Sequence, residues 1–373
     1  LRGFAAVAVM VAHYLGFFGP GRDLIAAMIC VPALPAEAHP VEFYSLWLDA
    51  SPFFNLAPFG VALFFIISGF VIPFSLQKMS WLGFSVNRLF RIVPTYLAGF
   101  SLTLFALLLG TRYFDVAWPY RLPEVLIHYV PGIRDILWSR HIDFIVWTLE
   151  IELKFYFLCA VLIVWLRRYS LKAFGAPVIL FLLALLLDRM LPGWEKNHAS
   201  FYRLGMVLLT ASRYIIFMFI GVMFHFLHRG KVNRNTACLG IFSLYALFCL
   251  HGLAGPYPWS PVLAGSYGIA LLTFAFAYVF PGPFRGNRVF NFLADISYPL
   301  YVIHAIAGFT ALRILSEKGF PHGLSLILVM AGCMFFAWLL HVLVEDPSQI
   351  LGKKLCLQLT GNSLSPAKPP PSA

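Results

Sequence analysis

Long apolar stretches alternate with short polar ones along almost the whole chain. A helix needs about 20 consecutive apolar residues to cross a bilayer, and runs of that order recur throughout. They predict ten membrane-spanning helices, with approximate bounds 2–19, 58–76, 94–110, 144–166, 174–191, 205–227, 236–253, 262–280, 290–311 and 323–344. The pattern therefore predicts an all-α polytopic membrane bundle, with a transmembrane domain over 1–350 and a disordered cytoplasmic tail over 351–373.

The composition excludes a soluble globular protein, because 60% of the 373 residues are hydrophobic and only 12% are charged. Of the 27 Lys and Arg residues, 15 fall on the side of the amino end when Arg2 and the carboxyl-terminal tail are counted with the short loops. The positive-inside rule then predicts that both ends are cytoplasmic. No nucleic-acid motif accompanies the net charge of +11, and the spacing of the six cysteines suggests neither disulfides nor a metal site.

The first apolar stretch contains two polar side chains that are costly inside a membrane, Arg2 and His13. At about 100° and 1.5 Å per residue, His13 returns to the helix face of Arg2, roughly 16 Å further along the axis. A neutral imidazole can accept a proton from an attacking hydroxyl group. We therefore expect this helix to carry chemistry.

Two arginines, Arg88 and Arg91, lie at the predicted cytoplasmic mouth between the second and third spans. On a helical turn both guanidinium groups project from one side, and their planar, permanently charged donors suit phosphate groups. Positive-inside topology alone explains the pair equally well.

The fourth predicted span contains two carboxylates, Glu150 and Glu152, which are expensive in a membrane unless they are paired or face water. Glu150 can meet Lys154 one helical turn later, which predicts a structural ion pair. Glu152 is then the freer group, and we expect it to orient a histidine of a neighbouring helix or to bind a polar substrate.

Two further spans carry small or polar residues. Ser68 and Gly69 near the end of the second span allow close approach of a neighbouring helix, so packing is the favoured interpretation of this pair alone. Ser297, Tyr301 and His304 form one polar stripe in the ninth span, which predicts that they face the bundle interior or a cavity. A buried histidine with one hydrogen bond remains the simpler alternative for His304.

In chain order, these segments resemble the motifs of the acyltransferase-3 family of integral membrane O-acyltransferases, which includes O-antigen and nodulation-factor acetylases. The matching segments are Arg2-x10-His13, Phe64–Phe70, Arg88–Pro94, Trp147–Tyr156, Ser297–His304 and Glu345–Pro347. Two positions depart from the family pattern, because Glu150 replaces a small residue and Lys154 a usual glutamine.

The resemblance implies transfer of an acyl group, often acetyl, from cytoplasmic acyl-CoA to a hydroxyl of a glycan or other small acceptor at a bacterial cell membrane. No permanently bound cofactor is expected, and acyl-CoA, in particular acetyl-CoA, is a substrate. A secondary transporter or exporter of an anionic or sugar-like solute is the alternative, because polar residues inside spans and basic mouths also suit transport.

The expected site has three groups of residues. They are catalytic His13 (the general base), Arg2 and Glu152; donor-binding Arg88, Arg91 and Ser68; and acceptor-binding Trp147, Tyr301 and His304.

Overall fold

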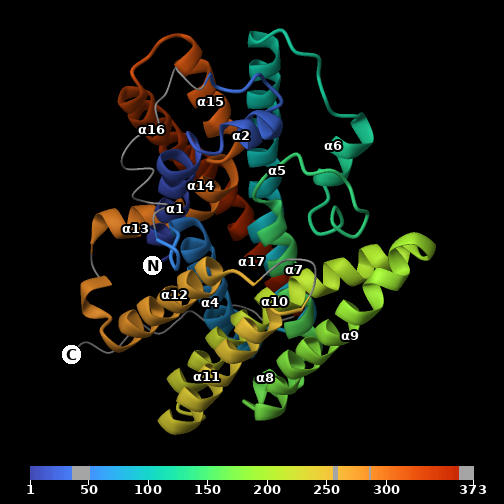
Figure 1. The fold of residues 1–373 in the computed structure, drawn as a ribbon. Helices are drawn as coiled ribbons and strands as arrows, with labels where there is room; N and C mark the ends of the chain where they lie inside the picture. The colour runs from blue at the N-terminus through green and yellow to red at the C-terminus, as the bar shows by residue number, and fades with distance from the viewer. Residues whose placement is uncertain (36–50, 255–258, 285–286, 361–373) are drawn as a thin grey trace.

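The computed structural model describes residues 1–35, 51–254, 259–284 and 287–360, and every regular element in them is helical (Figure 1). In chain order the elements are α1 (Arg2–Val11), the π-helical η1 (Ala12–Phe17), α2 (Arg22–Ile29), α4 (Leu56–Lys78), α5 (Trp81–Tyr113), α6 (Leu122–His128), α7 (Val146–Val161), α8 (Ile163–Arg167), η2 (Leu171–Phe174), α9 (Gly175–Asn197), α10 (Ala199–His228), α11 (Arg234–His251), α12 (Pro261–Val279), η3 (Gly282–Phe284), α13 (Arg288–Asp295), α14 (Ser297–Ile303), α15 (Ile306–Glu317), α16 (His322–Leu340), the π-helical η4 (His341–Glu345) and α17 (Asp346–Thr360).

Six helical stretches of the described chain are long and apolar enough to cross a membrane, or eight if two bent helix pairs each form one span. The chain is therefore an all-helical, multi-pass membrane protein, while the predicted number of ten spans is not confirmed. Residues 144–166 form two short helices, α7 and α8, instead of one long span. α11 covers most of 236–253, but it begins with the polar residues Arg234 and Asn235 and is not among the six.

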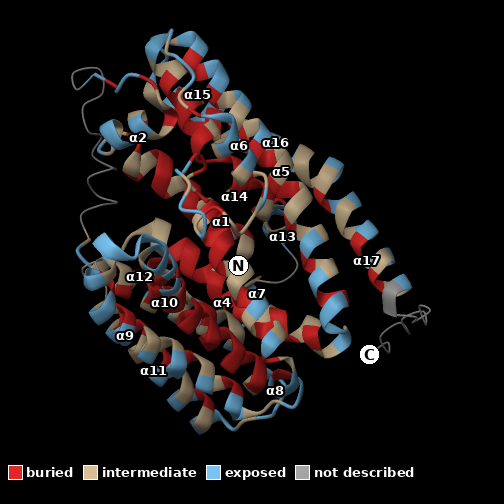
Figure 2. Ribbon diagram, turned by 90° about the vertical axis from the view of Figure 1, so that its right-hand side faces the viewer, coloured by how far each residue is buried: buried red, intermediate tan, exposed pale blue. Residues whose placement is uncertain are grey.

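The helices α4 and α10 form the centre of the bundle, where buried residues concentrate (Figure 2). α10 packs against α4, α9 and α11, and α1 also packs against α4. At the α4–α10 contact the backbones touch, since a Cβ at Gly69 would clash with the carbonyl oxygen of Met218 and one at Gly221 with that of Ile66. Gly69 therefore serves helix packing, as small residues do in membrane bundles.

Two helical stretches are sharply bent. α1 with η1 meets α2 at 115°, and α14 meets α15 at 56°. The predicted span 2–19 changes from α to π geometry at Ala12, and the predicted span 290–311 is divided among α13, α14 and α15. Irregular backbone is tolerated at membrane depth where it is buried in protein or lines a cavity. His13 and His304 lie at these two irregular points.

The predicted tail is partly helical. α17 continues to Thr360, so the boundary at residue 350 falls inside a helix and residues 351–360 are not disordered. Residues 361–373 lie outside the described residues.

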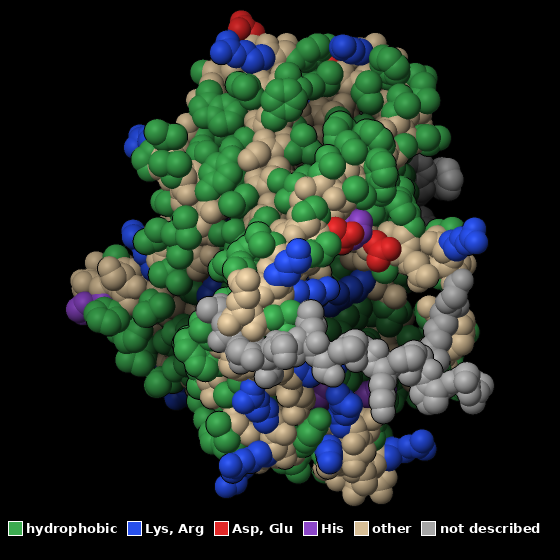
Figure 3. Space-filling model, turned by 180° about the vertical axis from the view of Figure 1, so that it is seen from behind, with side chains coloured by type: hydrophobic (Ala, Val, Ile, Leu, Met, Phe, Trp, Pro, Cys, Tyr) green, Lys and Arg blue, Asp and Glu red, His purple; other side chains and the backbone are tan. Residues whose placement is uncertain are grey.

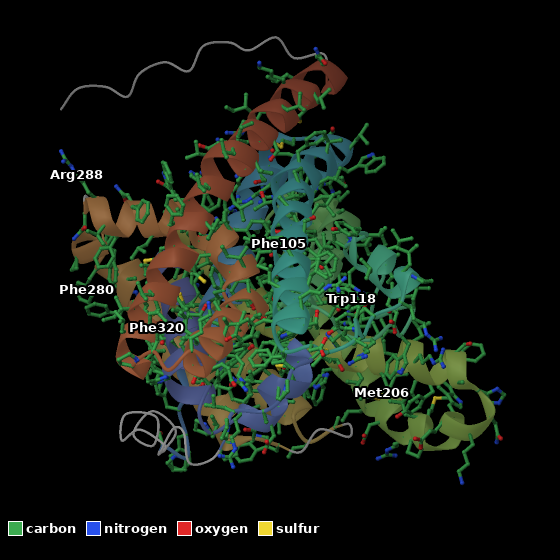
Figure 4. The ribbon with its side chains drawn as sticks, turned by 90° about the horizontal axis from the view of Figure 1, so that it is seen from above. Phe105, Trp118, Met206, Phe280, Arg288 and Phe320 are labelled. Carbon is green, nitrogen blue, oxygen red and sulfur yellow. The ribbon has the colours of Figure 1, made fainter. Side chains whose placement is uncertain are left out.

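The surface separates apolar from basic side chains. On the face in Figure 3, hydrophobic side chains cover much of the upper part, while most Lys and Arg side chains lie towards the lower end. Exposed aromatic residues such as Phe105, Phe280 and Phe320, labelled in Figure 4, lie on the outside of the bundle. An extended apolar surface of this kind is expected for a protein that contacts lipid.

Candidate active site

Two histidines from distant parts of the chain meet inside the bundle. His13 lies in η1 and His304 caps the end of α14, and their rings stack with centroids 5.0 Å apart. Nδ1 of His13 lies 3.0 Å from Nε2 of His304. Both residues are buried, with 8% of His13 and 0% of His304 exposed. The structure therefore brings the predicted base together with a residue predicted to bind the acyl acceptor.

The hydrogen bonds around His304 define the direction of this pair. Its Nδ1 lies 3.0 Å from the carbonyl oxygen of Leu300 and 2.9 Å from that of Tyr301. A carbonyl oxygen can only accept, so Nδ1 of His304 carries the proton and Nε2 of the neutral ring carries the lone pair. That lone pair accepts the hydrogen bond from Nδ1–H of His13. Nε2 of His13 is left with a lone pair, which is what a general base requires.

Tyr14 holds the break between α14 and α15 in place. Its hydroxyl donates to the carbonyl oxygen of His304 at 2.5 Å and lies 3.2 Å from Sγ of Cys333. This bond satisfies a carbonyl at a helix end, which would otherwise be costly at this depth. A Cβ at Gly308 would clash with the hydroxyl, so the bond requires glycine there. The sequence pattern did not single out Tyr14 as a site residue. Its position directly after His13 is the feature of the sequence that indicates its place beside the site.

A small cavity of about 80 Å³ lies among α1, α4, α5, α7 and α14. Five predicted site residues line it, namely Arg2, Ser68, Arg91, Glu152 and Tyr301. Tyr301 connects this cavity to the histidine pair, because its ring centre lies 5.7 Å from that of His304. The predicted polar stripe of α14 thus faces the bundle interior, as Ser297 also lines this cavity.

Hydroxyl groups hold Glu152 at the cavity wall. Its Oε1 accepts hydrogen bonds from Ser68 Oγ at 2.7 Å and from the Tyr156 hydroxyl at 2.5 Å. Within the described residues, the hydrogen bonds of Glu152 go to these hydroxyls and to neither histidine. His13 is therefore oriented by His304, not by a glutamate. Tyr156 was not predicted, although its spacing of one helical turn from Glu152 indicates contact.

The two arginines of the predicted phosphate pair are placed differently. Arg91 lines the small cavity. Arg88 is buried, donates from Nη2 to Ser75 Oγ at 2.5 Å, and lies 5.6 Å from the ring centre of Tyr156. The Arg88 guanidinium thus donates to Ser75 and packs against Tyr156, with its Nε left without a hydrogen-bond partner among the described residues. Arg2 and Arg91 are the arginines that line the small cavity.

A second cavity of about 860 Å³ is lined mainly by the segment before α7, by α7 and by α10, and neither His13 nor His304 is among its lining residues. Trp147, Phe144 and Tyr214 line it, and the rings of Trp147 and Tyr214 are 5.4 Å apart. The ring of Phe144 lies 5.3 Å from that of His13. Through Phe144 and Tyr301, the histidine pair is one side chain away from the larger and the smaller cavity, respectively.

The charged residues of α7 pair differently from the prediction. Glu150 accepts two hydrogen bonds from Arg134, at 2.8 Å from Nε and 2.5 Å from Nη2. Lys154 forms an ion pair with Asp135 at 2.6 Å. The predicted ion pair between Glu150 and Lys154 is therefore wrong, because the segment before α7 supplies partners that local helix spacing does not reveal. In the described part of the chain, no cluster of three His, Cys, Asp or Glu side chains is arranged to hold a metal ion.

A buried carboxyl group precedes α7. Asp143 is 1% exposed, and its Oδ1 accepts from the backbone N–H of Ile145 at 3.1 Å. Burial raises the pKa of Asp143 to about 7, and Glu150 contributes to the rise. Burial, together with Arg134, lowers the pKa of His141, a residue of the larger cavity, to about 4. Both groups are therefore mainly neutral between these two values.

Comparison with known proteins identifies the family of the chain. A family model of the acyltransferase-3 type, described as an acyltransferase domain, matches residues 1–342. No curated protein and no solved structure matches the chain. The matched region contains both histidines and the residues that line both cavities. The chain belongs to the acyltransferase-3 family of integral membrane O-acyltransferases.

Proposed function

We propose that this acyltransferase moves an acyl group, with acetyl as the favoured chain, from cytoplasmic acyl-CoA to a hydroxyl of a glycan or another small acceptor. The observation that carries the proposal is the hydrogen bond from His13 to His304, which leaves the Nε2 lone pair of His13 free. A hydroxyl group requires such a base to attack a thioester efficiently near neutral pH.

The small cavity suits the acyl end of the donor. Its volume of about 80 Å³ admits a short acyl chain, while the nucleotide part of acyl-CoA remains outside. Arg2 and Arg91 supply permanent positive charge for a donor phosphate at the end of the cavity remote from His13. Ser68 is held towards Glu152 and contributes to the polar wall that the thioester meets. The small volume is the reason for favouring acetyl over longer chains.

The larger cavity suits the acyl acceptor. Its volume of about 860 Å³ is in the range of small-molecule binding sites. Trp138, Trp147 and Tyr214 provide aromatic surfaces, and Ser139 and Arg140 provide polar groups. Aromatic surfaces can cover the apolar faces of a sugar ring while polar groups bind its hydroxyls, which supports a glycan acceptor.

The proposed reaction uses the histidine pair as base and positioning group. Nε2 of His13 takes the hydroxyl proton as the acceptor oxygen attacks the thioester carbonyl, while Arg2, roughly 16 Å along the helix from His13, binds the donor away from the reacting carbon. His304 holds the Nδ1–H of His13 and thereby selects the reactive tautomer. The tetrahedral intermediate then loses its C–S bond, and the His13 imidazolium returns the proton to the leaving thiolate. The products are an ester and free coenzyme A.

We further propose that the arginine-lined cavity opens towards the cytoplasm of a bacterial cell, with both chain ends on that side. The concentration of Lys and Arg towards one end of the molecule (Figure 3) supports this orientation through the positive-inside rule. Acyl-CoA then approaches His13 from the inside, and the acyl acceptor reaches the same imidazole through the larger cavity.

Thiol release tests the proposed function. Purified protein in lipid nanodiscs is incubated with acetyl-CoA and a panel of methyl glycosides, and free thiol and acetylated glycoside are both measured. His13→Ala should lower turnover at least about a hundredfold, whereas His198→Ala, at an exposed histidine, should not. Solute flux through the wild-type protein reconstituted into sealed liposomes, without thiol release in the nanodisc assay, would instead support a transporter.

A further inference from the structure

Arg213 is a buried cation without a counter-ion in the described part of the chain. It lies in an apolar part of α10 and is only 8% exposed. Within the described residues, its Nε and Nη2 atoms have no hydrogen-bond partner. By contrast, the buried Arg134 and Arg313 each pair with a glutamate. An unpaired buried charge is costly in a membrane protein, so we expect Arg213 to have a partner that is not among the described residues.

Two neighbours of Arg213 also carry a polar atom that makes no hydrogen bond to a described residue. Nδ1 of His251 and the hydroxyl of Tyr267 are buried and have no hydrogen-bond partner among the residues that the structure describes. Both side chains lie within electrostatic range of Arg213. The Arg213 guanidinium lies 5.3 Å from the ring centre of Phe248, whose ring stacks on that of Tyr267 at 4.7 Å. α10, α11 and α12 thus bring three unsatisfied polar groups to one place.

The chemistry of this cluster suits an anion. The free atoms of Arg213 are donors, and the Tyr267 hydroxyl can donate. Nε2 of His251 lies 2.7 Å from Ser212 Oγ, whose hydroxyl donates to the carbonyl oxygen of Leu209. With Nε2–H donating to Ser212, Nδ1 of His251 can gain a proton when an anion binds. Donors on three helices fit a tetrahedral anion better than a planar carboxylate, because phosphate oxygens accept from several directions.

The cluster lies away from the basic end of the bundle. α11 ends at His251 and α12 begins at Pro261, on the side opposite Arg229 and Arg234. From Arg213 to the end of α10, the helix rises about 22 Å at about 1.5 Å per residue. Because the hydrocarbon core is about 30 Å thick, this places the guanidinium within reach of the opposite membrane surface.

We propose that Arg213, Tyr267 and His251 form a binding site for a phosphate group, carried by a lipid headgroup or present as free phosphate. Nε and Nη2 of Arg213 donate to the phosphate oxygens, and Tyr267 and protonated His251 donate from the neighbouring helices. Bound phosphate neutralises the buried guanidinium. The site is distinct from the histidine pair and does not depend on the proposed acyl transfer.

Thermal unfolding in dodecyl maltoside, a detergent without phosphate, tests this site. One arm adds inorganic phosphate, and the other adds phosphatidylglycerol to the micelles. The wild-type unfolding temperature should rise saturably in at least one arm, and the responding arm identifies the source of the phosphate. Arg213→Met should abolish the rise, whereas Arg203→Met, at an exposed arginine of the same helix, should preserve it. Sodium chloride at equal ionic strength is the control for screening.

A second variant keeps the test valid if Arg213→Met does not fold. Tyr267→Phe removes one hydroxyl and keeps the ring packing, and it should weaken the apparent phosphate affinity about tenfold. The proposal is overturned if neither source of phosphate raises the wild-type unfolding temperature. It is also overturned if sodium chloride gives the same rise, or if the rise persists unchanged in Arg213→Met.

Discussion

Replacing His304 tests how the orientation of His13, the proposed base, affects the reaction while His13 itself stays in place. His304→Leu removes the atom that accepts the Nδ1–H of His13 at 3.0 Å, while an apolar side chain still fills the space. A buried donor left without its partner costs about 1–3 kcal/mol. His13 can avoid that cost by rotating or by moving its proton to Nε2, and either change removes the lone pair from the attacking hydroxyl. Since about 1.4 kcal/mol corresponds to a factor of ten in rate, kcat should fall about ten- to a hundredfold.

The assay is release of coenzyme A thiol at saturating acetyl-CoA and methyl glycoside. Because His304 acts through His13 and touches neither substrate in the proposed reaction, kcat should fall while both KM values stay within about twofold. His304→Gln offers an amide oxygen that can accept the same hydrogen bond, so it should recover part of the lost rate. The double variant His13→Ala with His304→Leu should be no slower than His13→Ala alone, because residues that act as one unit are not additive.

Three results would refute this reasoning. Full turnover in His304→Leu would show that His13 needs no partner on Nδ1. A loss confined to KM for the glycoside would make His304 an acceptor-binding residue, as the sequence motif predicts. Additive losses in the double variant would mean that the two histidines act on separate steps.

Three further predictions concern the segment before α7, the donor cavity and helix packing. The folded-state pKa of Asp143, about 7, lies above its ordinary value of 3.8, so this residue contributes a slope in which stability falls as the pH rises from about 4 to 7, by at most about 4 kcal/mol. His141, whose pKa is lowered to about 4, contributes a slope of the opposite sign, so the difference between wild type and a variant at position 143 isolates the Asp143 contribution. Asp143→Asn should remove the slope that Asp143 contributes. Thermal unfolding of both proteins in detergent from pH 4 to 8 measures this, and equal slopes for wild type and variant would contradict a neutral buried carboxyl group at position 143. Arg91→Met should raise KM for acetyl-CoA about tenfold, and Arg88→Met should have a smaller effect, because Arg91 lines the small cavity and Arg88 is packed behind it. Saturation curves for acetyl-CoA compare the two variants, and equal increases in KM would contradict this assignment. Gly69→Val should destabilise the fold by about 1–3 kcal/mol or more through its clash with the backbone of α10, and an unchanged unfolding temperature would show that the two helices can separate at no cost.

The sequence identified the residues of the site better than their partners. Periodicity indicates which residues of one helix share a face, so the stripe of α14 was correctly expected to face the interior. The bond between His13 and His304 joins residues 291 positions apart, and no local pattern reports such a contact. Both histidines were therefore assigned to chemistry, but to separate roles. Their direct hydrogen bond became visible only with the packing of α1 against α14.

Local rules also failed where a distant group made a better interaction. The spacing of Glu150 and Lys154 permits an ion pair on the helix surface, yet such pairs contribute only a few tenths of a kcal/mol. Arg134 approaches Glu150 with two parallel donors and replaces that pair. In the same way, spacing put Arg88 and Arg91 on one side of a helix but did not reveal that Arg88 is packed against Tyr156.

The irregular backbone positions the histidine pair one side chain away from each cavity. A regular helix presents each side chain to one neighbouring groove, but His13 lies in a π-helical segment and His304 at a break between two helices. π-helical segments often occur at functional sites because they displace side chains from the regular helical positions. The break also leaves the carbonyl oxygen of His304 available, and the Tyr14 hydroxyl donates a hydrogen bond to it. Glycine at position 308 leaves the space that this hydroxyl needs. In the proposed reaction, the same backbone irregularities that end the predicted spans hold His13 between the space suited to the thioester and the space suited to the hydroxyl.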